Sequence, residues 1–400
     1  MLLDAIELRR VELELSEPVR TWSGLHSARP VLIVRAIGTD CEGYGECAAL
    51  AEPTYTGEYL DEAERVLAQH LIPRLLARVG TPGGLSGTRT ASDFARRKVA
   101  TEVPHVLPPR TLAPQAVCEL LGDVKGHYMA KAALEMAVLD ADLSRDGISL
   151  AAFLGGTASH IRAGATVGIA RIAQDLVNQV KRIVDQGYKK VKVKIAPGWD
   201  LEPLREIRES FPDLALSADA NASYGRADIE SLTRLDSLGL VVLEQPFDPD
   251  DLVSHAALAS KLATPVGLDE SICTSYALEN AIELNACDAI CIKPHRVGGY
   301  LEARRIHDIC TSAGISIWCG GMFETSFARS AALALAALPG FNMPSDLAAS
   351  NRYFSTDLAP AHSLEHGMLK VPLAPGVGPR IDERTLRQLT SRSRWFKLDR

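Results

Sequence analysis

The sequence has few of the features that mark a nucleic-acid-binding, membrane or secreted protein. Its 43 Lys and Arg residues are outnumbered by 50 Asp and Glu residues and form no basic block, so we expect neither nucleic acid nor a membrane surface as a partner. The most apolar run, AALALAALPGF, breaks at Pro339 well short of a membrane span, and the N-terminus is charged from Asp4 onward. This composition predicts a small-molecule partner.

The eight cysteines lack the paired spacing of a zinc site or a disulfide framework. They are scattered over 400 residues, and several lie in apolar runs such as AICIK and ISIWCGG. This pattern is typical of reduced thiols in a protein core. The sequence therefore predicts a cytoplasmic protein.

Residues 1–125 predict a small α+β domain. Residues 4–47 alternate and turn like an antiparallel meander. From Glu58 the apolar residues recur at helical spacing, and a further helix, HYMAKAALEMAVLDADLSRDG, is expected to stop at Gly147. Between these helices, residues 79–114 are rich in Gly, Pro, Ser and Thr and predict a long loop insertion.

From about Arg162 the pattern changes to short β-branched runs that alternate with amphipathic helices. The first such helix is expected to bury one face that carries Ile172, Leu176, Val180 and Ile183. The strand-like runs number eight and recur every 24 to 28 residues. The residues that end them are Thr166, Lys194, Asp219, Glu244, Asp269, Lys293, Gly321 and Asp346.

Eight such units predict a (β/α)8-type barrel, whose functional groups come from the C-terminal ends of the strands. We assign the barrel to residues 126–355. Residues 356–400 are expected to return to the N-terminal domain, so that both together cap the barrel mouth.

Three of the strand ends carry carboxylates, namely Asp219, Glu244 and Asp269, at equal steps of 25 residues. Because successive strand ends are neighbours in a barrel, these acids should converge, and their repulsion would be relieved by a divalent cation. An all-oxygen ligand set without His or Cys selects a hard ion, Mg²⁺ or its substitute Mn²⁺. None of the ten histidines lies at these positions, which argues against zinc.

Three lysines are expected to flank the acids. Lys192 and Lys194 lie two residues apart in one strand and therefore point to the same face, which we take to be the interior. The positive charge of one should lower the proton affinity of the other, as a general base requires. Lys293 ends the sixth strand, opposite the second in a ring of eight.

This arrangement predicts a reaction class. A carboxylate substrate held at the cation can lose its α-proton to a lysine, and the resulting enediolate is stabilised by the cation and the opposite ammonium. The Lys293 amine could instead form a Schiff base, as in an aldolase. A barrel that only binds a ligand is the non-enzymatic alternative.

At these residues the chain resembles the enolase superfamily, in its muconate-lactonizing-enzyme-like branch and there in the o-succinylbenzoate synthase / N-succinylamino acid racemase family. The segments that carry the resemblance are ECAALAEPTYTGEY, KGHYMAKAALEMAVLDADL, KVKIAPGWD, SADANASY, LEQPF, GLDES, IKPHRVGG and WCGGMFE.

The resemblance implies Lys194 as the base on one side of the α-carbon and Lys293 as the acid/base or cation on the other. It implies Lys192 as the supporting lysine, and the three acids as Mg²⁺ ligands supported by the residues Asn221 and Glu270. Substrate contacts would come from Trp22, Tyr55, Thr166, Arg296, Gly321 and Met322.

The family's activities set the expected function. The first expectation is o-succinylbenzoate synthase, the dehydration of a cyclohexadiene carboxylate in menaquinone biosynthesis, and the alternative is N-acylamino acid racemization, with one enzyme able to do both. Ser326 and Ala328 stand where the family tends to have glycine, which affects the expected pocket shape. Barrel enzymes commonly associate, which leaves a homo-oligomer open.

A GxGxxA motif at Gly43–Ala48 also matches a dinucleotide-binding turn. Pro53 follows soon afterwards and prevents the helix that such a site needs. We therefore give the dinucleotide-binding interpretation little weight.

Overall fold

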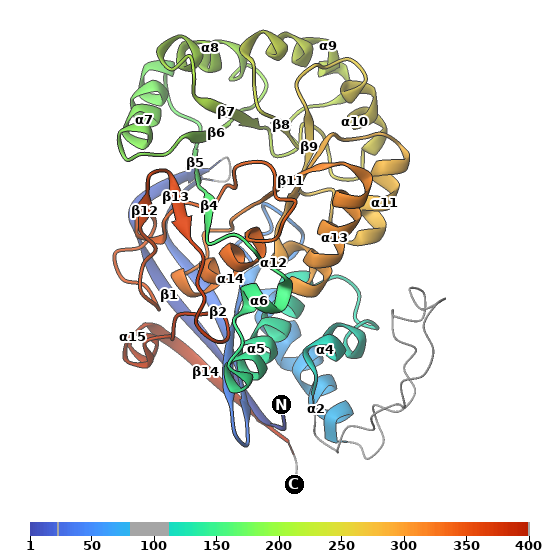
Figure 1. Cartoon of the computed structure of the whole chain (residues 1–400), viewed down its shortest axis with the longest axis vertical. Coiled ribbons are helices and arrows are strands. Elements are labelled where there is room, and N and C mark those ends of the chain that lie inside the picture. Colours follow the sequence, from blue (N-terminus) through green and yellow to red (C-terminus); the bar gives the residue numbers. More distant parts are fainter. Residues whose placement is uncertain (22–23, 81–111, 399–400) are drawn as a thin grey trace.

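Two sheets of different kinds organise the chain in the computed structural model, which describes residues 1–21, 24–80 and 112–398 (Figure 1). The antiparallel sheet has the order β14-β1-β2-β3. Its strands are β1 (Leu3–Thr21), β2 (Gly24–Gly38), β3 (Glu42–Cys47) and β14 (Thr390–Lys397). The expected meander is confirmed, and β14 brings the C-terminal tail back to the N-terminal domain by pairing with β1.

Helices cover one face of this sheet. They are α1 (Leu60–Val66), the π-helical turn η1 (Leu67–Leu71), α2 (Ile72–Gly80), α4 (Pro114–Leu120) and α5 (Tyr128–Asp146). Helix α5 ends as predicted, with Gly147 in the left-handed conformation at φ 71°. A loop insertion is expected at residues 79–114, but the helices on both sides extend into this range. Helix α2 continues to Gly80 and α4 begins at Pro114. Residues 81–111 lie outside the described part of the chain.

The glycines of the GxGxxA motif serve packing. Gly43 and Gly45 lie in β3 against α5, and a Cβ on Gly45 would overlap the carbonyl oxygen of Ala133. A Cβ on Gly43 would likewise overlap the backbone of Ala137 and Ala141. The motif therefore lets strand and helix backbones approach closely.

The second sheet is the parallel barrel, with the order β11-β10-β9-β8-β7-β6-β5. Its strands are β5 (Gly164–Val167), β6 (Lys190–Lys194), β7 (Ala215–Asp219), β8 (Leu243–Glu244), β9 (Val266–Leu268), β10 (Ala289–Ile292) and β11 (Ser316–Cys319). The predicted (β/α)8-type barrel with an N-terminal α+β cap completed by the C-terminal tail is confirmed. Where exactly the domains divide stays a prediction.

The eighth element, expected near PSDLA, is not a full strand. It is reduced to one parallel bridge between Gly320 and Asp346. Ser345 N donates to Arg162 O at 3.0 Å and Asp346 N donates to Cys319 O at 2.9 Å, so the segment still closes the ring between its two neighbours. Pro344 just before it has no N–H to extend the ladder.

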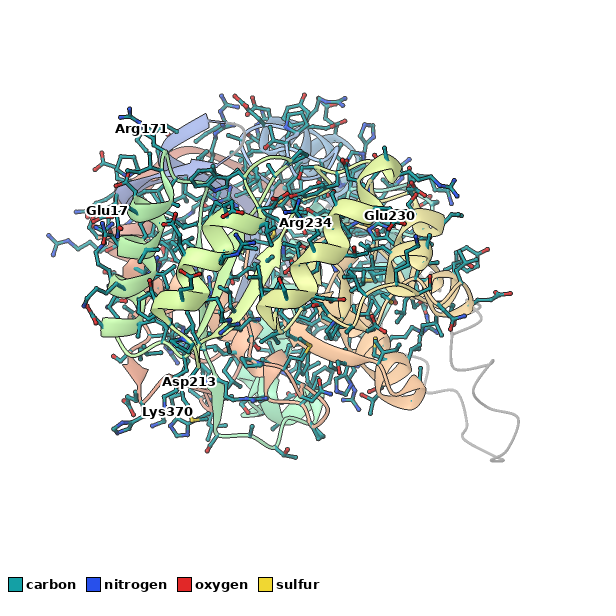
Figure 2. All side chains as sticks on the ribbon, turned by 90° about the horizontal axis from the view of Figure 1, so that it is seen from above. Glu17, Arg171, Asp213, Glu230, Arg234 and Lys370 are labelled. Carbon is teal, nitrogen blue, oxygen red and sulfur yellow. The ribbon has the colours of Figure 1, made fainter. Side chains whose placement is uncertain are left out.

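Helices surround the barrel, with charged side chains such as Arg171, Asp213, Glu230 and Arg234 on the outside (Figure 2). The helices are α6 (Leu150–Leu154), α7 (Ala173–Asp185), α8 (Leu201–Ser210), η2 (Arg226–Asp228), α9 (Ile229–Leu232), η3 (Thr233–Leu238), α10 (Leu252–Ala259), α11 (Ser275–Glu283), α12 (Pro294–Val297), α13 (Tyr300–Ala313), α14 (Ser326–Ala336) and η4 (Ser350–Arg352). The last helix, α15 (Glu383–Leu389), lies against β1 of the antiparallel sheet. A small sheet joins β4 (His160–Arg162), β12 (Leu364–Glu365) and β13 (Met368–Lys370).

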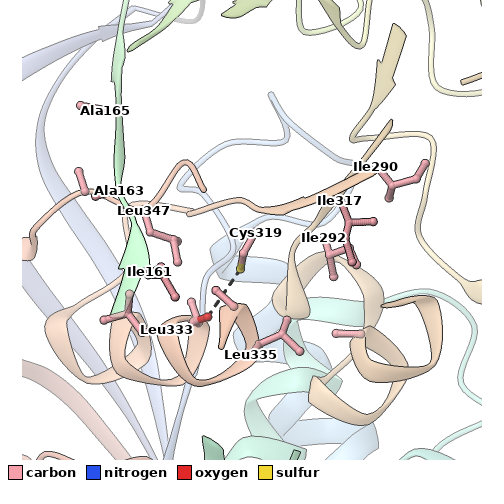
Figure 3. Packing of buried hydrophobic residues seen from close by; sticks show 14 of the residues in the cluster. Ile161, Ala163, Ala165, Ile290, Ile292, Ile317, Cys319, Leu333, Leu335 and Leu347 are labelled. Carbon is pink, nitrogen blue, oxygen red and sulfur yellow. Dashed lines mark hydrogen bonds between the residues drawn. The ribbon is translucent and has the colours of Figure 1, made fainter. Parts of the chain in front are cut away.

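The core lies between the barrel strands and these helices. Figure 3 shows apolar side chains of β10 and β11 in this core, and the β11 residue Cys319 lies close to α14, where its thiol donates to Ala332 O at 3.7 Å. The prediction for Ile172 is wrong: it precedes the first residue of α7 and is 57% exposed, because the helix begins only at Ala173.

All eight cysteines are free, and no described helix is long and apolar enough to cross a membrane.

The close approach of β3 to α5 gives a stability prediction. We expect Gly45→Ala to lower the free energy of unfolding by about 1–3 kcal/mol, because the new methyl group would force strand and helix apart. Gly57→Ala is the matched control, since nothing lies within 4 Å of its Cβ position. Denaturant unfolding followed by circular dichroism measures both, and equal midpoints for the two variants would contradict the packing role.

Candidate active site

The three predicted carboxylates lie at one end of the barrel on neighbouring strands. Asp219 ends β7 in register with Glu244 at the end of β8, and Asp269 directly follows β9. All three are at most 1% exposed. Oxygens of Glu244 and Asp269 lie within 4.8 Å of each other and of the Cys291 sulfur, whereas Asp219 approaches this group through the ammonium of Lys192.

Lys192 points into the barrel and binds the acids. Its Nζ donates to both carboxylate oxygens of Glu244, at 3.0 and 2.9 Å, and lies 3.1 Å from Asp219 Oδ2. Burial by itself lowers the pKa of Lys192, but the charges of Asp346, Glu244 and Asp219 raise it well above the ordinary value. For Lys192 the surrounding carboxylates therefore outweigh the like charge of its neighbour, and the lowered proton affinity expected of one member of the pair stays a prediction.

The pKa values of Glu244 and Asp219 are shifted by burial and by the charges close to them. Burial and the nearby charge of Asp219 raise the pKa of Glu244 to about 7, against the effect of Lys192. Burial alone would also raise the pKa of Asp219, yet the ammonium groups of Lys194 and Lys192 hold it well below its usual range. The acids thus repel one another and depend on nearby cations.

Lys194 lies on the same face of β6 as Lys192, nearer to the solvent. Its Nζ donates to Asp219 Oδ2 at 2.7 Å and to Asn221 Oδ1 at 2.5 Å, and its side chain is 30% exposed. Asn221 also donates its backbone N–H to Asp219 at 3.0 Å and its side-chain amide to Glu270 at 2.8 Å. Asn221 and Glu270 therefore stand beside the acid and the lysine that they are expected to support.

Lys293 binds Asp269 on the opposite wall, since β10 is four strands from β6 in the sheet order. Its Nζ lies 2.7 Å from Asp269 Oδ2, and it donates to the Tyr55 hydroxyl at 3.1 Å. Burial raises the pKa of Tyr55 to about 12, so the phenol keeps its proton and donates to Asp269 Oδ1 at 2.9 Å. Tyr55 comes from the segment between β3 and α1, so the N-terminal domain reaches the barrel mouth.

Arg296 is fully buried and is held by protein groups. Its Nη1 forms an ion pair with Asp269, its Nε donates to Ile272 O at 2.9 Å, and its Nη2 donates to Cys291 O at 2.6 Å. All three nitrogens of the guanidinium thus have partners within the chain. The contact that the structure displays for Arg296 is with an acid of the site, and the predicted contact with substrate stays a prediction.

Of the remaining predicted contact residues, Thr166, Gly321 and Met322 lie in the described part of the chain. Thr166 is half-buried on β5, opposite Lys192 in register. Gly321 and Met322 follow β11; a Cβ on Gly321 would stand 3.0 Å from the Arg329 guanidinium, and Met322 is 5% exposed in the core of the N-terminal domain. Trp22 lies outside the described residues.

Ser326 and Ala328, which stand where the family tends to have glycine, are both buried. The Ser326 hydroxyl donates to Ala359 O at 2.7 Å, which directs it to the C-terminal segment, and Ala328 is buried in α14.

Sequence reasoning missed a charged layer beneath the acids. Lys190 binds Asp346, which also binds Lys192 and accepts a hydrogen bond from Trp318. The period-2 pattern of KVKVK could have placed Lys190 on the inward face, and Asp346 was predicted only as a strand end. Cys291, which shares its strand face with Lys293, was also missed as a neighbour of Glu244 and Asp269.

A capped barrel with strand-end acids between opposed lysines defines the class of protein, and comparisons with known proteins agree. Residues 175–385 match the family described as enolase C-terminal domain-like. An N-succinylamino acid racemase from Amycolatopsis sp is 43% identical, with 99% of this chain and 100% of the relative covered. An o-succinylbenzoate synthase from Geobacillus kaustophilus is 36% identical over 98% of this chain and 97% of its own.

A solved structure extends the match. An enolase superfamily member from Listeria innocua superposes with a TM-score of 0.88 at 35% identity, covering 100% of both chains. The chain therefore belongs to the enolase superfamily and is an enzyme. Within it, the chain belongs to the family that contains the o-succinylbenzoate synthases and N-succinylamino acid racemases.

Proposed function

We propose that the protein is a Mg²⁺-dependent o-succinylbenzoate synthase, which dehydrates a hydroxycyclohexadiene carboxylate that bears a succinyl group. The observation that carries this proposal is the buried row of strand-end acids with Lys194 and Lys293 on opposite walls. Full-length relatives with this name support it. The role in menaquinone biosynthesis and the cytoplasmic location are part of the same proposal.

The donor set fits a hard divalent cation. Asp219, Glu244 and Asp269 offer only carboxylate oxygens, and the repulsion of Asp219, which adds to burial in raising the pKa of Glu244, is the kind that a cation relieves. Burial raises the pKa of the nearby Cys291 thiol well above its ordinary value, so it stays protonated and is a poor ligand for such an ion. Mg²⁺, with Mn²⁺ as a substitute, would supply positive charge to stabilise the substrate carboxylate as it gains negative charge.

The lysines divide the proton chemistry. The Lys194 amine removes the α-proton, and the Lys293 ammonium on the far side stabilises the enediolate. The C–O bond to the β-hydroxyl then breaks, and the hydroxyl leaves as water with the proton that Lys194 carried. Lys192, bound to Glu244 and Asp219, keeps these acids in place.

N-succinylamino acid racemization is the second candidate. The relative at 43% identity has this name, and the first proton transfer is the same. In racemization the opposite lysine must return a proton to the other face. The Schiff-base alternative is less compatible with Lys293, because its ammonium is paired with the buried carboxylate of Asp269. The formation of a homo-oligomer, left open by the sequence, stays a prediction.

The metal proposal predicts that EDTA abolishes activity and that Mg²⁺ or Mn²⁺ restores it. Glu244→Gln should weaken Mg²⁺ binding at least about tenfold through the loss of one charge, while the fold survives. Activity assays, titration calorimetry and circular dichroism measure this, with exposed Glu279→Gln as the control. Full activity in excess EDTA would overturn the metal assignment.

The lysine assignment predicts opposite stereochemistry for two variants. In D₂O, Lys194→Ala should lose exchange of the α-proton from one enantiomer of an N-succinylamino acid, and Lys293→Ala from the other, because the lysines face opposite sides of the substrate. Proton NMR of each enantiomer measures this exchange. Loss of both exchanges in each variant would indicate a single shared base.

Lys293→Arg separates the two candidate functions. Arginine keeps the positive charge but does not deprotonate in proteins, so racemization should be lost while some dehydration remains. Lys261→Arg, on the surface, is the matched control. For the wild type we expect a higher kcat/KM for dehydration than for any N-succinylamino acid, and the reverse ranking would make racemization the main function.

A further inference from the structure

A second charged layer lies directly beneath the three acids. Asp346 is buried, with Oδ1 2.9 Å from Lys190 Nζ and Oδ2 2.9 Å from Lys192 Nζ. Trp318 Nε1 donates to the same Oδ2 at 2.9 Å. Lys190 Nζ also donates to Pro344 O at 2.8 Å, so the lysine binds the segment that closes the barrel as well as its carboxylate.

Lys192 connects this layer to the acids above it. Its ammonium has three hydrogens and is shared between Asp346 on one side and Glu244 and Asp219 on the other, with the nitrogen 2.9 Å from both Asp346 and Glu244. The more strongly Asp346 binds this ammonium, the less of its charge and hydrogen bonding falls on the two upper acids. Lys190 acts in the opposite sense, because it neutralises Asp346.

We propose that Asp346 is a positioning residue that, balanced by Lys190, sets the affinity of the upper acids for a divalent cation. The inference rests on the proposed function for the statement that a cation binds there. Lys192 and a cation compete for the same oxygen atoms of Glu244 and Asp219. Asp346 takes up part of the charge and hydrogen bonding of this ammonium, which weakens the hold of Lys192 on those oxygens and lets a cation displace it.

This model predicts effects of opposite sign for two single substitutions. Asp346→Asn removes the lower negative charge, so Lys192 should bind the upper acids fully and Mg²⁺ affinity should fall about tenfold. Lys190→Met leaves Asp346 unbalanced, so Mg²⁺ should bind several-fold more tightly. The double variant loses both charges, and its affinity should return to within about threefold of the wild type.

The measurement is titration calorimetry of the full chain with MgCl₂ after removal of bound cations, with circular dichroism and melting temperatures for each variant. Asp288→Asn is the matched control, because this acid caps the backbone N–H of Val266 and is exposed. Its Mg²⁺ affinity should equal that of the wild type. No enzymatic assay is needed, so the result does not depend on the substrate.

Two outcomes would overturn the role of Asp346. One is a folded Asp346→Asn variant with wild-type Mg²⁺ affinity. The other is weaker binding in both single variants in parallel with their melting temperatures, which a purely structural role would produce. If Asp346→Asn fails to fold, the sign of the Lys190→Met effect still decides, since only tighter binding supports the proposal. Absence of Mg²⁺ binding by the wild type would instead overturn the proposed function itself.

Discussion

The ion pairing inside the barrel is the interaction on which the rest of the site depends. A buried carboxylate without a partner is costly, and here every acid at the strand ends has a cationic side chain within ion-pair distance. Lysines and acids come from different strands, so each pair is formed only when those strands have paired, and the contacts of Lys190 and Lys192 with Asp346 also need the closing element of the barrel. The ion pairs that stabilise the buried charges therefore also fix the relative positions of the reacting groups.

Side chains of the N-terminal domain form hydrogen bonds with residues of the barrel at two places. Tyr55 places its hydroxyl on Asp269 and its ring 4.6 Å from Lys293, measured to the ring centroid. Deeper in the interface, Glu46 of β3 accepts hydrogen bonds from the backbone and hydroxyl of Thr325 just before α14. These contacts of Tyr55 and Glu46 join the cap to the barrel, and through Tyr55 the cap takes part in the site.

Dehydration and racemization place different demands on one framework. Both need a base, a cation that accepts negative charge and a positive group on the far side of the substrate. They differ only in whether the far group must also give up a proton. A pair of lysines on opposite walls meets both demands, which is consistent with relatives of both names aligning with this chain over nearly its full length.

Local patterns in the sequence are enough to predict the order of the elements and the strand ends. Regular spacing located seven of the eight barrel elements as strands, and the tolerance of glycine for the left-handed conformation located the end of α5 at Gly147, because both signals are local. The tertiary structure alone decided that Arg296 binds Asp269, that Lys192 is shared by three acids, and that Lys190 and Asp346 lie below them. These partners are far apart in the chain, and the charge state of each depends on distances that only the closed barrel sets. Spacing can therefore identify which residues end the strands, but the pairing of their charges is a property of the folded interior.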